Sequence, residues 1–154
     1  MERMKRKVKL LLSGTSGGHL TELLTLFDDL EGIDIIVFSE KSQRLSAIPY
    51  RSFSYTRPHG ELLTMIVSGM KALYIILRER PDWIITTGAE CGAAALIAGK
   101  LLFRKTMFIE TASRYRTKTM AARICYPFAD KFYVQHEEAL AIYGKKAEYI
   151  GGGL

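Results

Sequence analysis

The segment Gly14-Thr15-Ser16-Gly17-Gly18-His19 follows the apolar run Val8-Lys9-Leu10-Leu11-Leu12-Ser13 and precedes residues with a helical apolar pattern. A buried strand, a glycine turn and a helix start in that order form a site for an anion. Glycines let the backbone approach a ligand closely, and the first N–H groups of the helix point at it. The helix dipole favours phosphate there. The segment therefore predicts a phosphorylated ligand; the alternative is a tight turn without a ligand.

The spacing of these glycines excludes two familiar phosphate loops. The pattern Gly-x-x-x-x-Gly-Lys-Ser/Thr of a P-loop is absent, and no lysine stands where it could reach terminal phosphates. The spacing Gly14-x-x-Gly17-Gly18 also differs from the dinucleotide fingerprint, although an acidic residue, Glu40, closes the second predicted strand region. The glycine turn therefore indicates neither a P-loop NTPase nor a dinucleotide-dependent oxidoreductase.

Composition and charge narrow the class of partner. The 154 residues are 48% hydrophobic and 25% charged, as in soluble globular domains, and carry a net charge of +6. This charge favours phosphorylated substrates, anionic lipid headgroups or nucleic acid. The two cysteines, Cys91 and Cys125, have neither pairing nor metal-ligand spacing and are expected to be reduced thiols in the cytosol. No apolar run is long enough for a signal peptide or a membrane span.

Short β-rich runs alternate with helical patterns along the whole chain. We expect helices at residues 18–30, 39–48, 61–78, 93–103, 119–126 and 137–143, and strands at residues 8–12, 33–38, 51–56, 83–87, 106–110, 131–135 and 148–150. Such alternation is typical of an α/β fold with right-handed crossovers. We therefore predict one Rossmann-like domain over residues 1–154, with a mostly parallel sheet and helices on both faces.

Three segments with polar or small residues follow predicted strands. They are the glycine turn at residues 14–19, a second small-residue loop, Gly88-Ala89-Glu90-Cys91-Gly92, and the segment Glu110-Thr111-Ala112-Ser113-Arg114. Ligands of open parallel sheets bind outside the carboxyl ends of the strands. The three segments are therefore expected to meet at one edge of the sheet and to form one site.

The same segments resemble a known family. The glycine turn is similar to the first loop of GT-B glycosyltransferases that act on polyprenyl-diphosphate acceptors. A closer resemblance is to the acceptor-binding, membrane-associated subunit of the split UDP-N-acetylglucosamine transferase of N-glycan assembly and its bacterial capsule and exopolysaccharide counterparts. The other matching blocks are Pro81-Asp82-Trp83-Ile84-Ile85-Thr86-Thr87-Gly88, Phe108-Ile109-Glu110-Thr111-Ala112-Ser113-Arg114 and, most specifically, Tyr126-Pro127-Phe128-Ala129-Asp130-Lys131-Phe132-Tyr133-Val134-Gln135.

The resemblance implies half of an enzyme. A GT-B transferase has two Rossmann-like domains with the active site between them, and this chain corresponds to the N-terminal, acceptor-binding one. We expect a small catalytic partner that carries the UDP-sugar site, and little transferase activity without it. The acceptor would be a polyprenyl-diphosphate glycan, and N-acetylglucosamine, galactose and glucose all fit as donor sugars. No cofactor or metal is expected, because no Asp-x-Asp pair is present and the three histidines are far apart in sequence.

The resemblance also suggests roles for individual residues. We expect the acceptor diphosphate to be bound by residues of all three segments: Gly14, Thr15, Ser16, Gly17, Gly18, Gly88, Glu90, Ser113, Arg114 and Arg116. The hydroxyls of Thr15 and Ser16 could instead cap the helix. An inverting transfer needs a base for the attacking hydroxyl, and His19 and Glu110 are both candidates that the sequence does not rank. His19 could instead bind phosphate or only satisfy the turn, and Glu110 could form an ion pair with Arg114 or Arg116.

A lipid-linked acceptor requires contact with the membrane. The apolar helix predicted at residues 61–78 could be a core element, or its outer side could enter the interface of an anionic membrane. The basic residues near the N-terminus and at 104–105 would support docking. We expect a cytoplasmic protein bound peripherally to the inner face of the membrane. Two rival interpretations are a stand-alone module for a phosphate or nucleotide ligand and an RNA-binding protein; we expect no nucleic acid, because no RNA-recognition motif is present.

Overall fold

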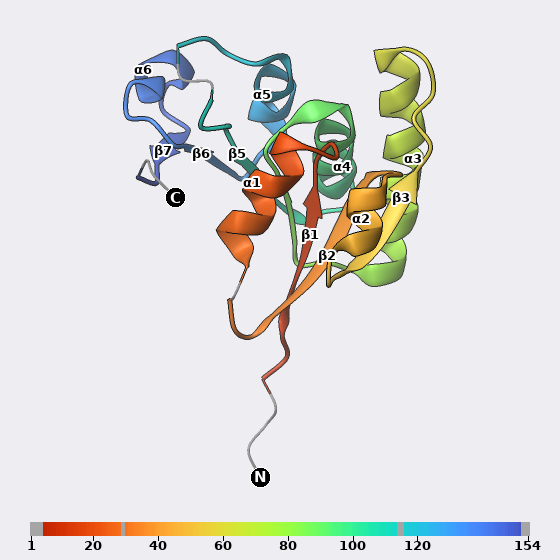
Figure 1. Ribbon diagram of the computed structural model, residues 1–154. Helices are drawn as coiled ribbons and strands as arrows, with labels where there is room; N and C mark the ends of the chain where they lie inside the picture. Colours follow the sequence, from red (N-terminus) through yellow and green to blue (C-terminus); the bar gives the residue numbers. More distant parts are fainter. Residues whose placement is uncertain (1–4, 29, 114–115, 152–154) are drawn as a thin grey trace.

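The computed structural model describes residues 5–28, 30–113 and 116–151, which form a seven-stranded sheet flanked by helices (Figure 1). The strand order is β3-β2-β1-β4-β5-β6-β7, and every neighbouring pair is parallel. The predicted Rossmann-like α/β arrangement is confirmed. The strands are β1 (Val8–Ser13), β2 (Ile33–Glu40), β3 (Arg51–Tyr55), β4 (Trp83–Thr86), β5 (Lys105–Ile109), β6 (Lys131–Val134) and β7 (Ala147–Tyr149).

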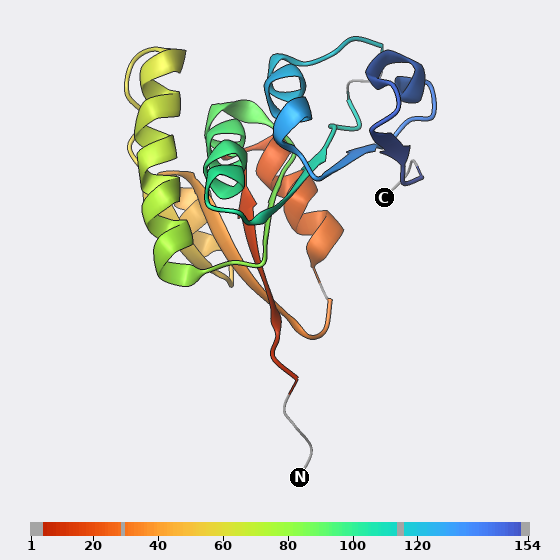
Figure 2. The same cartoon turned by 180° about the vertical axis from the view of Figure 1, so that it is seen from behind.

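Helices cover both faces of the sheet. Helices α1 and α2 lie on one face, and α3, α4 and α5 lie on the other, as the two opposite views show (Figures 1 and 2). Helix α6 shares a core with α5 and the β5–β7 strands. The helices are α1 (Gly18–Phe27), α2 (Gln43–Ala47), α3 (Glu61–Glu79), α4 (Ala89–Leu101), α5 (Met120–Cys125), a 3₁₀ turn (Tyr126–Phe128) and α6 (Ala139–Tyr143).

The alternation of side chains along β1 explains the two layers. Leu10 and Leu12 point to one face, where they pack with Leu20 and Leu23 of α1. Leu11 points to the other face and packs with residues of α3 and α4. Because both faces of a parallel strand are covered, its residues form a continuous apolar run rather than an alternating one.

Three predicted helices have wrong boundaries, and two of them are the helices on the α1 and α2 face of the sheet. The helix predicted at residues 18–30 ends at Phe27, because Asp28 takes an extended backbone conformation and Leu30 stays exposed, so a longer helix would bury nothing. The helix predicted at residues 39–48 starts later, at Gln43. Ser39 and Glu40 instead extend β2, where they pair with β3.

The second small-residue loop is shorter than predicted. Helix α4 begins at Ala89 instead of residue 93, so only Thr87 and Gly88 link it to β4. Gly92 is part of this helix, and a Cβ atom built on it would lie 2.0 Å from the Thr86 hydroxyl oxygen. Glycine is needed at this position for close packing of helix on strand, and not for a turn. The ends of the other predicted elements differ from the structure by one or two residues.

The strand order reverses at β1. From β1 the chain moves outward to β2 and β3, returns through α3, and continues in the opposite direction from β4. A crevice opens outside the carboxyl ends of two adjacent strands at such a point, and ligands of α/β sheets bind there. Here these strands are β1 and β4.

Candidate functional site

A cavity of about 650 Å³ lies at this reversal point. Its walls come from the start of α1, the link between β4 and α4, the segment after β5, the start of α5, and the residue that follows β6. The predicted meeting of three segments at one sheet edge is confirmed. The lining residues include Gly18, His19, Glu22, Thr25, Leu26, Thr87, Gly88, Ala89, Thr111, Ala112, Ser113 and Gln135.

Two helices begin at this cavity, and both have glycine at the N-cap. Gly17 precedes α1 with φ +142°, and Gly88 precedes α4 with φ +131°, values that side chains strongly disfavour. Neither helix has a side-chain cap. Their first-turn N–H groups are therefore left for a ligand, and both dipoles favour an anion. The cavity combines two half-sites of the kind that bind phosphate.

His19 lies between the two glycine turns. Its Nδ1 atom is 3.3 Å from the hydroxyl oxygen of Thr87, and the same hydroxyl donates to the carbonyl oxygen of His19 at 3.1 Å. Thr87 has one hydroxyl proton, so its oxygen can only accept at Nδ1. This arrangement favours the tautomer with the proton on Nδ1. It leaves Nε2 as the nitrogen with a lone pair.

The segment after β5 is attached to α1 by a pair that sequence analysis missed. Oε1 of Glu22 accepts hydrogen bonds from the Ala112 backbone N–H (2.8 Å) and from Nε2 of Gln135 (2.5 Å). Gln135, which is buried, also donates to the carbonyl oxygen of Glu110 at 3.0 Å. Two features of the sequence point to Glu22 and Gln135 as site residues. Glu22 follows His19 by three residues, on the same helix face, and Gln135 stands directly after a predicted parallel strand.

Glu110 is placed differently from the cavity residues. Its side chain is 1% exposed and does not line the cavity. The carboxylate accepts hydrogen bonds from the Thr111 N–H (3.0 Å) and the Thr119 hydroxyl (3.3 Å), and from the Tyr143 hydroxyl. Burial raises its pKa, which these hydrogen bonds lower in part. Because Thr119 also caps α5, Glu110 connects β5 to α5 and α6.

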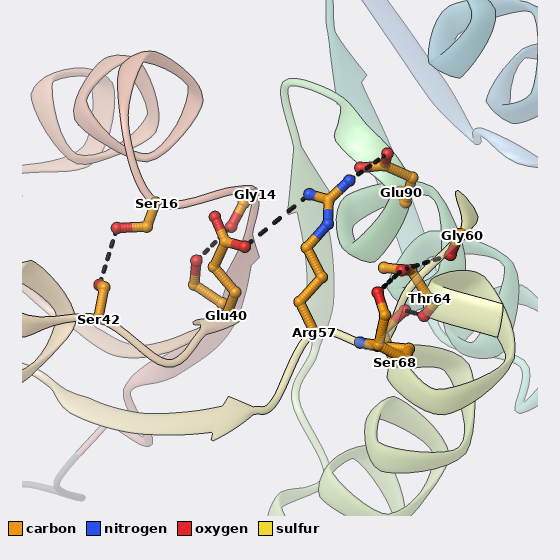
Figure 3. A network of polar contacts seen from close by, with 11 residues as sticks. Gly14, Ser16, Glu40, Ser42, Arg57, Gly60, Thr64, Ser68 and Glu90 are labelled. Atoms are coloured by element: carbon orange, nitrogen blue, oxygen red, sulfur yellow. Dashed lines mark hydrogen bonds and ion pairs between the residues drawn. The ribbon is translucent and has the colours of Figure 1, made fainter. Parts of the chain in front are cut away.

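The first part of the glycine turn is bound to the neighbouring strand instead of lining the cavity. The carbonyl oxygen of Gly14 accepts the Ser39 hydroxyl at 2.6 Å, and Ser16 donates to Ser42 at 2.8 Å (Figure 3). Ser42 in turn caps α2. Of the predicted phosphate-binding residues, Gly18, Gly88 and Ser113 line the cavity; Gly14, Thr15, Ser16, Gly17, Glu90 and Arg116 do not, and Arg114 lies outside the described residues.

Glu90 faces away from the cavity, toward an arginine. In the first turn of α4, its carboxylate pairs with Arg57 at 3.0 Å, and Arg57 also approaches Glu40 at 3.8 Å (Figure 3). These ion pairs connect the carboxyl ends of β2 and β3 to the start of α4. The position of Glu90 follows from the earlier start of α4, which the sequence interpretation had taken as a loop.

The two cysteines lie in different parts of the core. Cys91 and Cys125 are buried and unpaired with each other, and burial raises the pKa of the Cys91 thiol to about 11. Within residues 5–28, 30–113 and 116–151, no group of three or more His, Cys, Asp or Glu side chains is arranged to hold a metal ion.

Fold and cavity together define a Rossmann-like domain with a cavity at the carboxyl edge of its sheet. The domain is similar to part of the crystal structure of Acinetobacter baumannii MurG, with a TM-score of 0.73, 11% sequence identity, and coverage of 96% of this chain and 46% of that one. At this identity the likeness concerns the fold. The chain spans a little under half of MurG.

Sequence comparison defines the family. The family model "Oligosaccharide biosynthesis protein Alg14 like" matches residues 59–152, more than half of the chain, and the chain belongs to the Alg14 family. It is 25% identical to the UDP-N-acetylglucosamine transferase subunit ALG14 of Kluyveromyces lactis, covering 97% of this chain and 79% of that protein.

A second relative is a longer enzyme. The chain is 30% identical to the UDP-N-acetylglucosamine–N-acetylmuramyl-(pentapeptide) pyrophosphoryl-undecaprenol N-acetylglucosamine transferase of Chlorobium luteolum, over 66% of this chain but 34% of that enzyme. The resemblance stated from the sequence blocks is therefore confirmed at the level of the family.

Proposed function

We propose that this chain is the acceptor-binding subunit of a two-component glycosyltransferase. It binds a polyprenyl-diphosphate-linked glycan at the membrane, and a separate catalytic subunit brings the UDP-sugar. The observation that carries this proposal is the pair of uncapped, glycine-led helix starts at one cavity, beside His19. Two adjacent helix N-termini suit a diphosphate, which presents two anionic groups at short separation.

The neutralisation of the diphosphate is expected to come mainly from backbone groups. Among the described residues, no Lys or Arg lines the cavity. The N–H groups at the starts of α1 and α4 would therefore bind the phosphate oxygens, with hydroxyl donors such as Ser113 beside them. Preorganised backbone dipoles of this kind stabilise charge without reorganisation.

His19 is the better candidate for the base that accepts the proton of the attacking hydroxyl. It lines the cavity, and its contact with Thr87 leaves the Nε2 lone pair available. Glu110 is buried among donors that already bind its carboxylate, so its geometry suits a positioning role. A base must reach the proton that it removes, which favours the cavity residue.

A second subunit is expected to complete the site. The relative from Kluyveromyces is described as a transferase subunit, and the fold corresponds to a little under half of MurG. The UDP-sugar site would then lie on the partner, facing the carboxyl edge of this sheet. UDP-N-acetylglucosamine is the first donor to test, because the names of both relatives carry it.

Helix α3 provides a surface suited to an anionic membrane. Its inner side, with Ala72, Ile75 and Ile76, packs on the sheet, which confirms the core interpretation for that side. Its outer side exposes large apolar residues, and the exposed Leu101 at the end of α4 lines one groove with Ile66 of α3. The exposed residues of α3 are Leu62, Leu63, Ile66, Met70 and Leu77.

Cations flank this apolar surface. Lys71 lies over the ring of Tyr74, whose hydroxyl accepts a hydrogen bond from Arg78. An apolar strip bordered by basic residues is the pattern of an interfacial helix on anionic lipid. None of the helices in the described part of the chain has the length and apolar character to cross a membrane.

Reconstitution tests the proposed function. The full chain is co-expressed with a candidate catalytic subunit, and transfer from UDP-N-acetylglucosamine to a polyprenyl-diphosphate glycan is measured with each chain alone and with both. We expect activity only with both chains, and its loss in His19→Ala and Gly17→Ala. Glu31→Gln, a charge change at an exposed site before β2, serves as the control. Full activity of the partner alone would overturn the proposal, as would unchanged activity of both variants.

A further inference from the structure

The lining of the cavity changes in character along α1. At the first turn, Gly18 and His19 face the start of α4, and the lining is dominated by backbone donors. Two turns further, Thr25 and Leu26 line the same cavity, about 10 Å along the helix at 1.5 Å per residue. Glu22 lies between these ends. The cavity therefore has helix N-termini at one end, a carboxylate in the middle, and a hydroxyl and an apolar side chain at the other end.

In the described part of the chain, one oxygen of the Glu22 carboxylate has hydrogen-bond partners and the other has none. Oε1 accepts both the Ala112 N–H and the Gln135 amide. Within the described residues, no donor binds Oε2, and no Lys or Arg lines the cavity to offset the charge. An ionised carboxylate accepts hydrogen bonds that are about twice as strong as those between neutral groups. Oε2 is thus a strong acceptor for a ligand that carries O–H or N–H groups.

The negative charge of Glu22 also restricts which ligand groups can lie beside this side chain. A phosphate next to Glu22 would meet a like charge in a partly enclosed space, which is unfavourable. This repulsion favours a diphosphate at the helix starts and an uncharged, hydroxyl-bearing group at Glu22. Thr111, next to Ala112 whose N–H binds Glu22, adds a hydroxyl, and Leu26 offers an apolar side chain to pack on a sugar ring.

We propose that Glu22 recognises the sugar attached to the acceptor diphosphate and selects an uncharged one, by accepting a hydroxyl hydrogen bond at Oε2. The inference rests on the proposed function, which supplies a diphosphate-linked glycan as ligand. Gln135 is a positioning residue, because it holds Oε1 of Glu22 and the segment after β5 in place. The orientation of the acceptor follows, with its diphosphate at the glycine turns and its first sugar along α1.

Glu22→Gln tests the assignment with little change in shape. The amide oxygen of glutamine can keep both contacts of Oε1, while its NH₂ group replaces the acceptor Oε2 and removes the charge. The probes are citronellyl diphosphate, its N-acetylglucosaminyl ester, and the matching uronic acid ester, in which a carboxylate replaces the CH₂OH group. Binding to the full-length chain is measured by calorimetry, with Glu31→Gln as the charge-matched control.

We expect Glu22→Gln to weaken binding of the N-acetylglucosaminyl ester about tenfold, the equivalent of one charge-assisted hydrogen bond, while binding of citronellyl diphosphate stays within about twofold. The wild type should bind the uronic acid ester more weakly than the neutral ester, and the variant should reduce this difference. Equal weakening of the sugar-free and sugar-bearing probes would overturn the inference, because it would mean that Glu22 only shapes the cavity. An unchanged preference for the neutral ester would overturn the selection by charge.

These outcomes separate the inference from the function on which it rests. If the wild type binds none of the three probes, the proposed function fails and the inference fails with it. If the wild type binds citronellyl diphosphate, and His19→Ala or Gly17→Ala weakens that binding, the diphosphate site at the helix starts stands whatever Glu22→Gln does.

Discussion

Replacement of Gly92 by alanine should destabilise the protein, although alanine favours helices. A Cβ atom at this position would lie 2.0 Å from the Thr86 hydroxyl oxygen and 3.1 Å from the carbonyl oxygen of Ser13. The strand carbonyl cannot move without breaking the sheet, so the Thr86 side chain must rotate. That rotation breaks the hydrogen bond that the Gly88 N–H donates to the Thr86 hydroxyl, at 3.0 Å.

The magnitude follows from three contributions. Overpacking costs about 1–3 kcal/mol, and loss of the hydrogen bond about 1 kcal/mol. The higher helix propensity of alanine offsets about 1 kcal/mol. The expected net loss is therefore about 1–3 kcal/mol in the free energy of unfolding.

Gly69→Ala provides a matched control in the neighbouring helix. Its Cβ atom would lie 3.8 Å from that of Ala94, an ordinary contact, so the variant should be at least as stable as the wild type. Urea denaturation followed by circular dichroism measures both variants. A Gly92→Ala variant as stable as Gly69→Ala would refute the close-packing explanation for this glycine.

Three further predictions concern other parts of the molecule. Ser42→Ala should cost about 1 kcal/mol in the free energy of unfolding, since it removes the cap of α2 and the Ser16 contact; an unchanged urea midpoint would contradict this. Burial raises the pKa of Glu110 above its ordinary value of 4.5, so its contribution to stability is present below that pH and is lost as the pH rises through the raised pKa. Relative to Glu110→Gln, the wild type should therefore lose stability as the pH rises above 4.5 in paired urea titrations, and a gain with rising pH would count against the assignment. Met70→Glu should reduce sedimentation with anionic liposomes about tenfold or more, from loss of roughly 1.5–3 kcal/mol of apolar burial, while Gln43→Glu on the opposite face should not; equal behaviour of the two variants would exclude α3 as the docking surface.

Local patterns predicted most of the fold. The apolar runs at residues 8–12 and 33–38 identify buried parallel strands because both faces of such a strand are covered. The glycine turn before α1 was recognisable because a strand, glycines and an amphipathic helix follow one another within a few residues. The boundaries that failed depend on contacts between distant residues: Ser39 and Glu40 join β2 through pairing with β3, and Gly92 is helical because it packs on Thr86.

For the site, the sequence alone determined its place, at the carboxyl ends of β1, β4 and β5, and its central residues Gly18, His19 and Gly88. Which side chains face the cavity depended on tertiary structure, because the direction of a side chain is decided by the elements packed around it. Thus Glu90 turns to Arg57, and Glu110 is enclosed with Tyr143, both outside the lining. Glu22 and Gln135, 113 residues apart in the chain, meet because α1 packs over the sheet next to the end of β6.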